Sequence, residues 1–262
     1  RGGWRYHPAM LAQAIATLGE MFPGRLPWMA RGSGEAINEH IVGAGWPDKA
    51  DRDARLEESA GVIRRLLHGE PVTSQGRLSV IDAKVWSRPV RATQLVGAAM
   101  SEGTAQGVAR WAEGLLTTSC SIEDLRKFVD AYRNAGGTGD LHLKVDLSWA
   151  PSEEEALLNA HEQWRFLQPG RLAAENFRLP EDFENASRNV TPEQMREVVL
   201  VSADVDTHIE WLRERAALGF RTLDLHNVGR NQREFIGGVG RPVVPELRAD
   251  QSGTSGSPAL RA

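Results

Sequence analysis

Residues 114–149 read GLLTTSCSIEDLRKFVDAYRNAGGTGDLHLKVDLSW and carry the plainest fold signal of the chain. The apolar run at 114–117 predicts a short strand, and residues 122–135 predict a helix that two glycines close. From 141 to 149 the sequence alternates with a period of two, and one face is apolar: Leu141, Leu143, Val145, Leu147 and Trp149. A strand, a helix and a second strand in succession predict a βαβ unit with parallel strands.

The same alternation continues on both sides of this unit. Further strands are predicted at residues 26–31, 95–99, 198–202 and 222–226. Helices are predicted at 8–21, 56–67, 102–111, 152–167 and 205–216 and again near the C-terminus, with a hairpin or small excursion at 76–86. Repeated units without a dinucleotide-binding fingerprint favour an α/β fold of the (β/α)₈ barrel type over a doubly wound sheet.

In a (β/α)₈ barrel the loops that follow the strands meet at one face, and this face carries function. Four segments of the chain would lie there: 32–39, 98–101, 117–121 and 226–230. The sequence therefore predicts one shared site at the carboxyl ends of the strands.

The first of these segments reads GSGEAINE at 32–39. Glycine lets the backbone turn sharply because it has no Cβ, so backbone N–H groups and the Glu35 carboxylate would share a small space. Such a turn suits an anionic or carbonyl-bearing ligand. On its own the motif is weak evidence for a site, because a plain turn explains it more often.

Several motifs together resemble a known family. YHPAMLAQA at 6–14 and ATLGEMFPGR at 16–25 precede GSGEAINE, and LVGAA at 95–99, WAEGLLT at 111–117 and LHNVGRNQ at 225–232 follow it. In this order and spacing they resemble the luciferase-like flavin and deazaflavin oxidoreductases. The branch is that of F420-dependent glucose-6-phosphate dehydrogenase, and the likeness is closer still to its probable non-F420 flavinoid relatives. It runs from about residue 6 to about residue 248.

The resemblance implies a luciferase-like TIM barrel that is incomplete. In the family, the segment matching 6–14 opens the third helix, so the first two βα units and the third strand would lack a counterpart here. That is roughly 75–80 residues at about 30 residues per unit, which leaves about five barrel strands. We expect either a truncated sequence or a partner that supplies the rest of the wall. The expected organisation is one barrel domain over 1–248 and a disordered tail, rich in Ser, Gly and Pro, over 249–262.

The resemblance also implies roles for individual residues. Glu35 would lie beside a flavin-type ring, FMN or F420, and protonate it during hydride transfer; a carboxylate can do this where burial raises its pKa. Its alternative role is a solvated loop carboxylate or a helix cap. Residues implied to hold the cofactor are Gly32, Ser33, Gly34, Asn38, Ala98, Ala99 and Thr118. Of these, Asn38 is equally a helix cap, Ala98 and Ala99 are nearly as well explained by strand-end packing, and Thr118 matches a position near the substrate phosphate.

The chain also departs from the family pattern. Ser121 stands where the dehydrogenase branch has a phosphate-gripping lysine, which argues against glucose 6-phosphate as substrate. The strand at 26–31 looks one residue longer than in the family. Pro27 cannot donate to a strand ladder, and Arg31 places a charge where the family has an aliphatic residue; a bulge could absorb this difference. The family's histidine and tryptophan near the cofactor ring belong to units without a counterpart here.

Several other side chains could take part in chemistry but have simpler structural interpretations. His7 is expected to cap or pack at the start of its helix, and His226 to face the mouth in a structural or phosphate-side role. His161 and Trp164 are interpreted as packing on a helix. Cys120 is either incidental or a reactive thiol.

The composition of the chain limits which classes of function are possible. The chain has 262 residues, 41% of them hydrophobic, and a formal net charge of −4, which suits one globular domain and predicts no nucleic-acid partner. No apolar run approaches the ~18 residues of a membrane helix. The single cysteine excludes an intramolecular disulfide and favours a reducing cytoplasm. No motif has metal-ligand spacing, so no metal site is predicted.

The leading hypothesis is an oxidoreductase that moves a hydride between FMN or F420 and a small organic substrate, compatible with a homodimer. The alternative is a barrel fragment or partner subunit with no catalysis of its own. A third hypothesis is a carrier that binds the cofactor without turnover.

Overall fold

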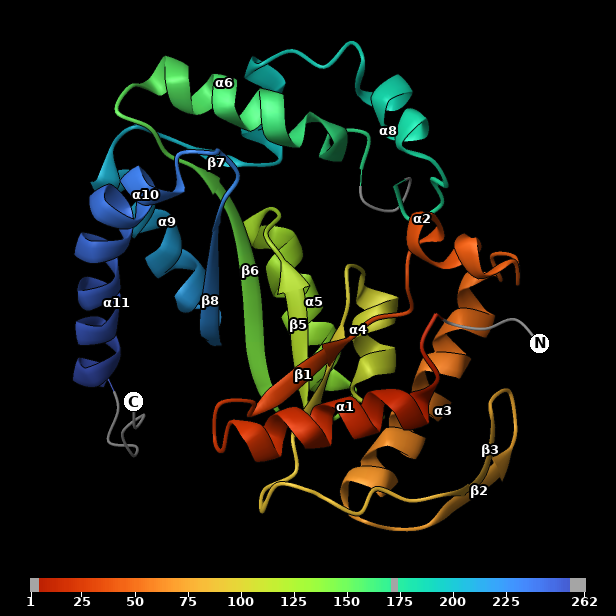
Figure 1. Ribbon diagram of the computed structural model, residues 1–262. Coiled ribbons are helices and arrows are strands. Elements are labelled where there is room, and N and C mark those ends of the chain that lie inside the picture. The colour runs from red at the N-terminus through yellow and green to blue at the C-terminus, as the bar shows by residue number, and fades with distance from the viewer. Residues whose placement is uncertain (1–4, 171–173, 255–262) are drawn as a thin grey trace.

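The computed structural model describes residues 5–170 and 174–254, the last six as backbone only. In this part of the chain six strands form one sheet. Five of them are parallel neighbours in chain order (Figure 1): β1 (Trp28–Arg31), β4 (Gln94–Ala98), β5 (Gly114–Thr118), β6 (Asp140–Ser148) and β8 (Phe220–Asn227). The sixth, β7 (Leu200–Val201), pairs only with the end of β6. The predicted α/β class with a parallel sheet is confirmed.

Helices surround this sheet (Figure 1). The longer ones are α1 (Pro8–Met21), α3 (Lys49–Leu67), α4 (Glu102–Val108), α5 (Ile122–Asn134), α6 (Glu153–Trp164), α8 (Pro180–Ser187), α9 (Val205–Ala216) and α11 (Arg241–Thr254). Short elements are α2 (Ala36–Glu39), α10 (Gln232–Phe235) and the single turns His40–Val42, Arg165–Leu167, Glu193–Glu197 and Ile236–Gly240. Helices α6 and α8 lie beyond the carboxyl end of β6, where the sequence places the site.

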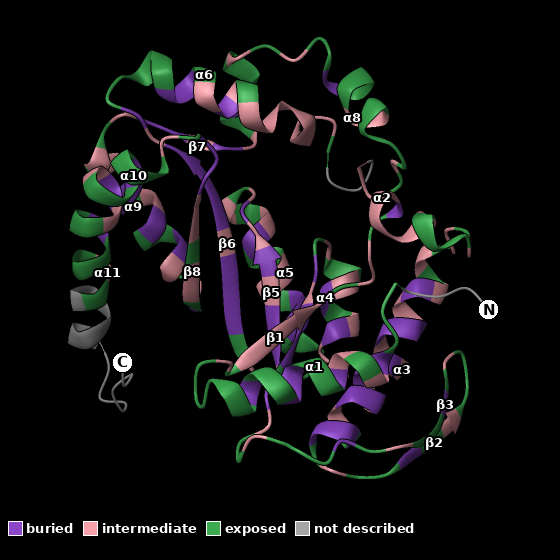
Figure 2. Cartoon of the chain, in the orientation of Figure 1, coloured by how far each residue is buried: buried purple, intermediate pink, exposed green. Residues whose placement is uncertain are grey.

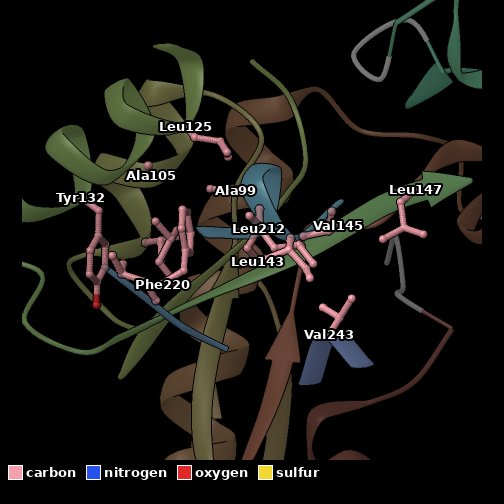
Figure 3. Close-up of a cluster of buried hydrophobic side chains, with 14 of the residues drawn as sticks. Ala99, Ala105, Leu125, Tyr132, Leu143, Val145, Leu147, Leu212, Phe220 and Val243 are labelled. Carbon is pink, nitrogen blue, oxygen red and sulfur yellow. The ribbon is translucent and has the colours of Figure 1, made fainter. Parts of the chain in front are cut away.

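One face of the sheet packs against helices to form the core. The apolar residues of β6 belong to one buried cluster with side chains of α4, α5 and α9, and Figure 3 shows Leu143 beside Leu212. Strand β6 is buried along most of its length (Figure 2). Because side chains alternate along a strand, the residues between the apolar ones face the opposite side of the sheet.

That opposite side is concave. The rings of Trp28 on β1 and His142 on β6 lie 4.5 Å apart, although β4 and β5 separate these strands in the sheet. Neighbouring strands are about 4.8 Å apart, so three spacings of a flat sheet would hold the two strands about 14 Å apart. The contact therefore requires a sheet curved like part of a barrel wall, and in the described residues β1 and β8 each pair on one side only.

Several sequence boundaries are corrected by the structure. No bulge is needed before the turn, because β1 pairs with β4 in unbroken register from Trp28 to Arg31. Pro27 precedes the strand and only accepts a hydrogen bond, 3.0 Å from the Gln94 nitrogen, so its missing N–H costs the ladder nothing. The predicted hairpin is confirmed as β2 (Val72–Gln75) and β3 (Ser79–Ala83).

The helices differ from expectation mainly at their ends. Helix α3 begins at Lys49, where the Asp48 side chain accepts from the Asp51 backbone. Helix α8 forms inside a segment with poor periodicity. Helix α11 continues to Thr254, into the segment expected to be a disordered tail, and residues 255–262 lie outside the described residues.

The buried side chain of His208 should make the folding stability of the chain depend on pH. It is fully buried on α9, with Nε2 3.0 Å from the Ser202 carbonyl oxygen, and its buried Nδ1 has no hydrogen-bond partner among the described residues. Burial lowers the pKa of His208, because a second N–H would enter the interior without an acceptor. The unfolded chain takes up this proton near pH ~6.5 and the folded chain only below it, so stability falls as the pH drops below about 6.5.

We therefore expect a lower urea midpoint at about pH 5.5 than at about pH 7.5. In His208→Gln the difference should shrink without vanishing, since burial also lowers the pKa of His142. An unchanged pH dependence in the variant would remove His208 as its cause.

Candidate functional site

The turn after β1 has the geometry that its glycines suggest. Gly34 has a φ of +88°, and a Cβ there would lie 2.9 Å from Cγ of Glu39. Both features disfavour any other residue. The chain then enters α2, with Glu35 in the N-cap position but making no side-chain capping bond.

Two pairs of predicted site residues come together at this turn. A Cβ on Gly32 would lie 3.6 Å from the Cβ of Ala98, so the turn runs directly beside the end of β4. The Asn38 amide donates to Glu35 Oε2 at 3.2 Å. Glu35 is exposed, so the described residues do not supply the burial expected for it.

Charge at the turn centres on Glu39, which the sequence analysis missed. The Arg5 backbone nitrogen donates to Glu39 Oε2 at 3.1 Å, and Arg5 Nε lies 3.7 Å from Oε1. Burial lowers the pKa of Arg31, and the Glu39 carboxylate acts in the opposite direction. Glu39 follows Glu35 by four residues, a helical spacing that could have identified it as a second carboxylate at the site.

A cavity of about 130 Å³ opens at this point. Its lining includes Arg31, Ser33 and Glu39 and the two glycines of the turn. Pockets that enclose whole ligands measure about 300–1,000 Å³, so this one fits part of a cofactor rather than all of it. A second cavity of about 540 Å³, between α1 and residues 82–87, has none of the predicted site residues in its lining.

Ala99 and Thr118 lie in different surroundings. Ala99 belongs to the core cluster beside α4, so its side chain packs there. Thr118 ends β5 in register with Lys144 on β6, on the concave face.

A second polar group lines the concave face. Asp146 on β6 is 1% exposed, and its Oδ1 lies 2.7 Å from Lys144 Nζ and 2.8 Å from His226 Nδ1. The sequence placed His226 at the mouth but missed Lys144 and Asp146. The alternation of residues 141–149 could have identified both, because polar residues between core residues face the inside of a barrel.

His7, His161 and Trp164 make capping or packing contacts. His7 caps α1 by accepting from the Ala9 nitrogen, as predicted, and its Nε2 lies 2.9 Å from the Ser79 oxygen. His161 bonds the Val190 carbonyl. Trp164 packs with Phe166 as expected, and its ring also lies 4.8 Å from that of His226.

Residues 174–177 cross to the turn from the α6 side of the mouth. The Ala36 nitrogen donates to the Glu175 oxygen at 2.9 Å, and the Glu175 carboxylate pairs with buried Arg52 on α3. Trp46 Nε1 donates to Asn176 at 3.0 Å. These contacts anchor the crossing segment beside Glu35.

Two kinds of site find no support in the described ranges. They contain no cluster of three or more His, Cys, Asp or Glu residues able to hold a metal ion. Within those ranges no helix has both the length and the apolar character needed to cross a membrane.

Comparisons with known proteins identify the family of this chain. The family described as Luciferase-like monooxygenase matches residues 2–222. The F420-dependent glucose-6-phosphate dehydrogenase of Microbacterium testaceum (strain StLB037) is 34% identical over 258 residues, covering 94% of this chain and 75% of that protein. Its namesake from Mycobacterium tuberculosis (strain ATCC 25618 / H37Rv) is 30% identical over 260 residues, covering 94% and 76%.

Solved structures support the fold. An F420-dependent secondary alcohol dehydrogenase in complex with an F420–acetone adduct superposes with a TM-score of 0.84 at 24% identity, over 94% of this chain and 76% of that one. The EDTA monooxygenase from Chelativorans sp. BNC1 gives 0.62 at 18% identity, over 94% and 71%. The predicted luciferase-like fold is confirmed, and the described strands form part of its barrel wall.

Proposed function

Because the chain belongs to the luciferase-like monooxygenase family, we propose that it is an oxidoreductase that moves a hydride between F420 or FMN and a small organic substrate. The observation that carries this proposal is the glycine turn at 32–34, which runs beside Ala98 and next to the Glu35–Asn38 pair. The lone cysteine supports a cytoplasmic location.

The turn fits the edge of a planar ring system. Gly32 and Ala98 leave the space beside the strand ends free of large side chains, and Ser33 and Gly34 offer backbone groups there. Asn38 presents an amide that can donate or accept. The bound cofactor supplies the two-electron chemistry. A ring held over the turn would cover Glu35, and its carboxyl group could then exchange a proton with the ring.

The substrate differs from that of the sugar-phosphate dehydrogenases. The curated relatives are named for glucose 6-phosphate, but Ser121 caps α5 through a bond to the Asp124 nitrogen and carries no positive charge. A small substrate without a phosphate group fits this position better.

A binding-deficient chain without activity is the second candidate. The observation that favours it is the size of the cavity at the turn, about 130 Å³, which is below that of a full cofactor site. Titration of the purified chain with FMN and with F420, followed by fluorescence quenching, separates the two candidates. Saturable binding of one cofactor supports the oxidoreductase, and binding of neither supports the inactive chain.

Glu35→Gln should lower turnover about ten-fold or more, because the amide cannot exchange the proton. The cofactor dissociation constant should change less than about two-fold, since the Asn38 contact keeps an acceptor oxygen. Glu20→Gln, on the exposed side of α1, is the matched control and should behave as wild type. Wild-type turnover in Glu35→Gln would remove this carboxylate from the mechanism.

A further inference from the structure

The larger cavity, of about 540 Å³, lies between α1 and the segment that follows β3. Figure 1 shows this segment passing beside α1 on its way to β4. The volume falls within the range of about 300–1,000 Å³ of pockets that enclose small molecules. Among the described residues, none lines both this cavity and the smaller one at the glycine turn. The two cavities are therefore separate candidate sites.

The walls of the larger cavity are held in place by contacts at both ends. At one end His7 Nε2 lies 2.9 Å from the Ser79 oxygen, which joins the start of α1 to β3. At the other end Gly19 of α1 meets Pro89 so closely that an added Cβ would lie 2.7 Å from the proline Cγ. Between these contacts Val85 is buried in a cluster that also contains residues of α1. The cavity is therefore formed by the fold itself, before any ligand binds.

Trp86 is exposed beside this cavity in a way that folding does not explain. It lines the cavity and yet is 80% exposed, and Met10 on the α1 side is 62% exposed. A buried tryptophan removes about 150–250 Å² from water, so Trp86 leaves most of that gain unused in the free chain. Aromatic side chains of this kind, standing at a preformed pocket, are typical anchors for a bound molecule.

The charge beside the cavity favours an anion. Lys84 Nζ lies 4.1 Å from the centre of the Trp86 ring, and no described carboxylate pairs with it. The carboxylate in the lining, that of Asp82, accepts from Thr73 Oγ1 at 3.0 Å within the hairpin. The stretch 83–101 contains no acidic residue and three basic ones: Lys84, Arg88 and Arg91. A ligand that pairs with Lys84 should therefore carry a negative charge.

The lining also offers hydrogen-bonding groups and apolar surface. The side chains of Gln13 and Ser87 make no hydrogen bond to any described residue, and both an amide and a hydroxyl can donate or accept. Leu66 and Val85, which are buried, add apolar surface to the same lining. A molecule with a flat apolar body and one acidic group matches this combination.

We propose that this cavity binds a small aromatic carboxylate. The aromatic ring of the ligand stacks on the Trp86 indole, the carboxylate pairs with Lys84 Nζ, and Gln13 or Ser87 donates to its second oxygen. Stacking and a partly exposed ion pair are each modest in energy, but together they select a ligand that has both a ring and a negative charge. The site lies outside the proposed cofactor site and does not depend on hydride transfer.

Calorimetric titration with indole-3-acetate tests the choice of ligand. We expect saturable binding with a Kd below about 1 mM, weakening as salt is added, because the ion pair is exposed to solvent. Tryptamine has the same ring with a positive charge, and cyclohexaneacetate has the carboxylate without an aromatic ring. Each should bind about five-fold more weakly or worse. No saturable binding of indole-3-acetate, or equal affinity for either analogue, would overturn the proposal.

Variants locate the bound molecule. Trp86→Leu should weaken the binding of indole-3-acetate about five-fold or more. Lys84→Gln should weaken it about three-fold or more and remove its salt dependence. Phe22→Leu, at the exposed end of α1, and Lys127→Gln, on the exposed side of α5, are the matched controls and should bind as wild type. Thermal melting of each variant reports whether it folds.

Nitrogen-15 spectra of the indole N–H groups give a second readout. The Trp86 signal, assigned by its loss in Trp86→Leu, should shift when indole-3-acetate is added. The signal of Trp149, whose Nε1 donates to the Ala203 oxygen at 2.9 Å, should stay in place. Undiminished binding in either variant, or an unshifted Trp86 signal, would mean that the ligand binds elsewhere and would overturn the proposal. Either result leaves the proposed oxidoreductase function standing.

Discussion

Gly139→Ala is expected to lower the free energy of unfolding by about 3 kcal/mol or more. A Cβ at this position would lie within 2.4 Å of the Glu113 carbonyl carbon and closer still to its oxygen. Glu113 cannot move away from the added Cβ, because its carboxylate accepts hydrogen bonds from Arg64 Nε at 2.6 Å and from the Leu95 nitrogen at 2.6 Å. The start of β6 or of β5 must therefore move away from its neighbour.

Thermal and urea unfolding measure this effect. For a chain of this size, about 3 kcal/mol corresponds to a fall in Tm of about 6–12 °C. Gly61→Ala is the matched control, since it lies inside α3 with no atom within 4 Å of the added Cβ and should gain up to about 1 kcal/mol. A Gly139→Ala variant that melts within about 2 °C of wild type would mean that the two strands can move apart without loss of stability.

Arg52→Met is expected to lower the free energy of unfolding by about 3 kcal/mol. Arg52 is 3% exposed, pairs with Glu175, and donates to the Pro47 oxygen at 2.7 Å. Burial lowers the pKa of Arg52, while Asp53 and Asp48 act in the opposite direction. Methionine fills most of the volume but leaves the Glu175 carboxylate half-buried without its partner, and that unpaired charge is the main cost.

The crossing segment at 174–177 should also loosen in this variant. We expect faster trypsin cleavage after Arg178, which is exposed next to the segment. Adding Glu175→Met should recover part of the stability, because no unpaired carboxylate remains. Arg65→Met is the matched control: the Arg65–Glu70 pair is half exposed and should cost less than about 1 kcal/mol. Equal losses in Arg52→Met and Arg65→Met would contradict a special role for the buried pair.

The sequence determined the local structure because the forces involved act over a few residues. The period of two in residues 141–149 and the helical stripe at 122–135 are hydrophobic patterns that any packed core would use. Ser121 and Ser152 cap α5 and α6 by accepting from backbone nitrogens three residues further along the chain. The glycine turn at 32–34 follows from backbone sterics alone.

The order of the strands also follows from the sequence. Helical connections between short strands favour parallel neighbours in chain order, and β1, β4, β5 and β6 have that order; β8 pairs directly with β6, although β7 lies between them in the chain. Boundaries were less predictable, since β1 begins only after Pro27 and α8 forms in a segment of poor periodicity. There tertiary contacts outweigh the local pattern.

Only the tertiary structure decided which residues form the concave site. Asp146 and His226 are 80 residues apart and meet because β6 pairs with β8 in a register that places them side by side. Arg52 and Glu175 meet because a crossing segment folds back over α3. Alternation along a strand determines which side chains share a face. Which face turns inward is decided by the curvature of the sheet and by the helices that bury the other side, and those depend on contacts between distant residues.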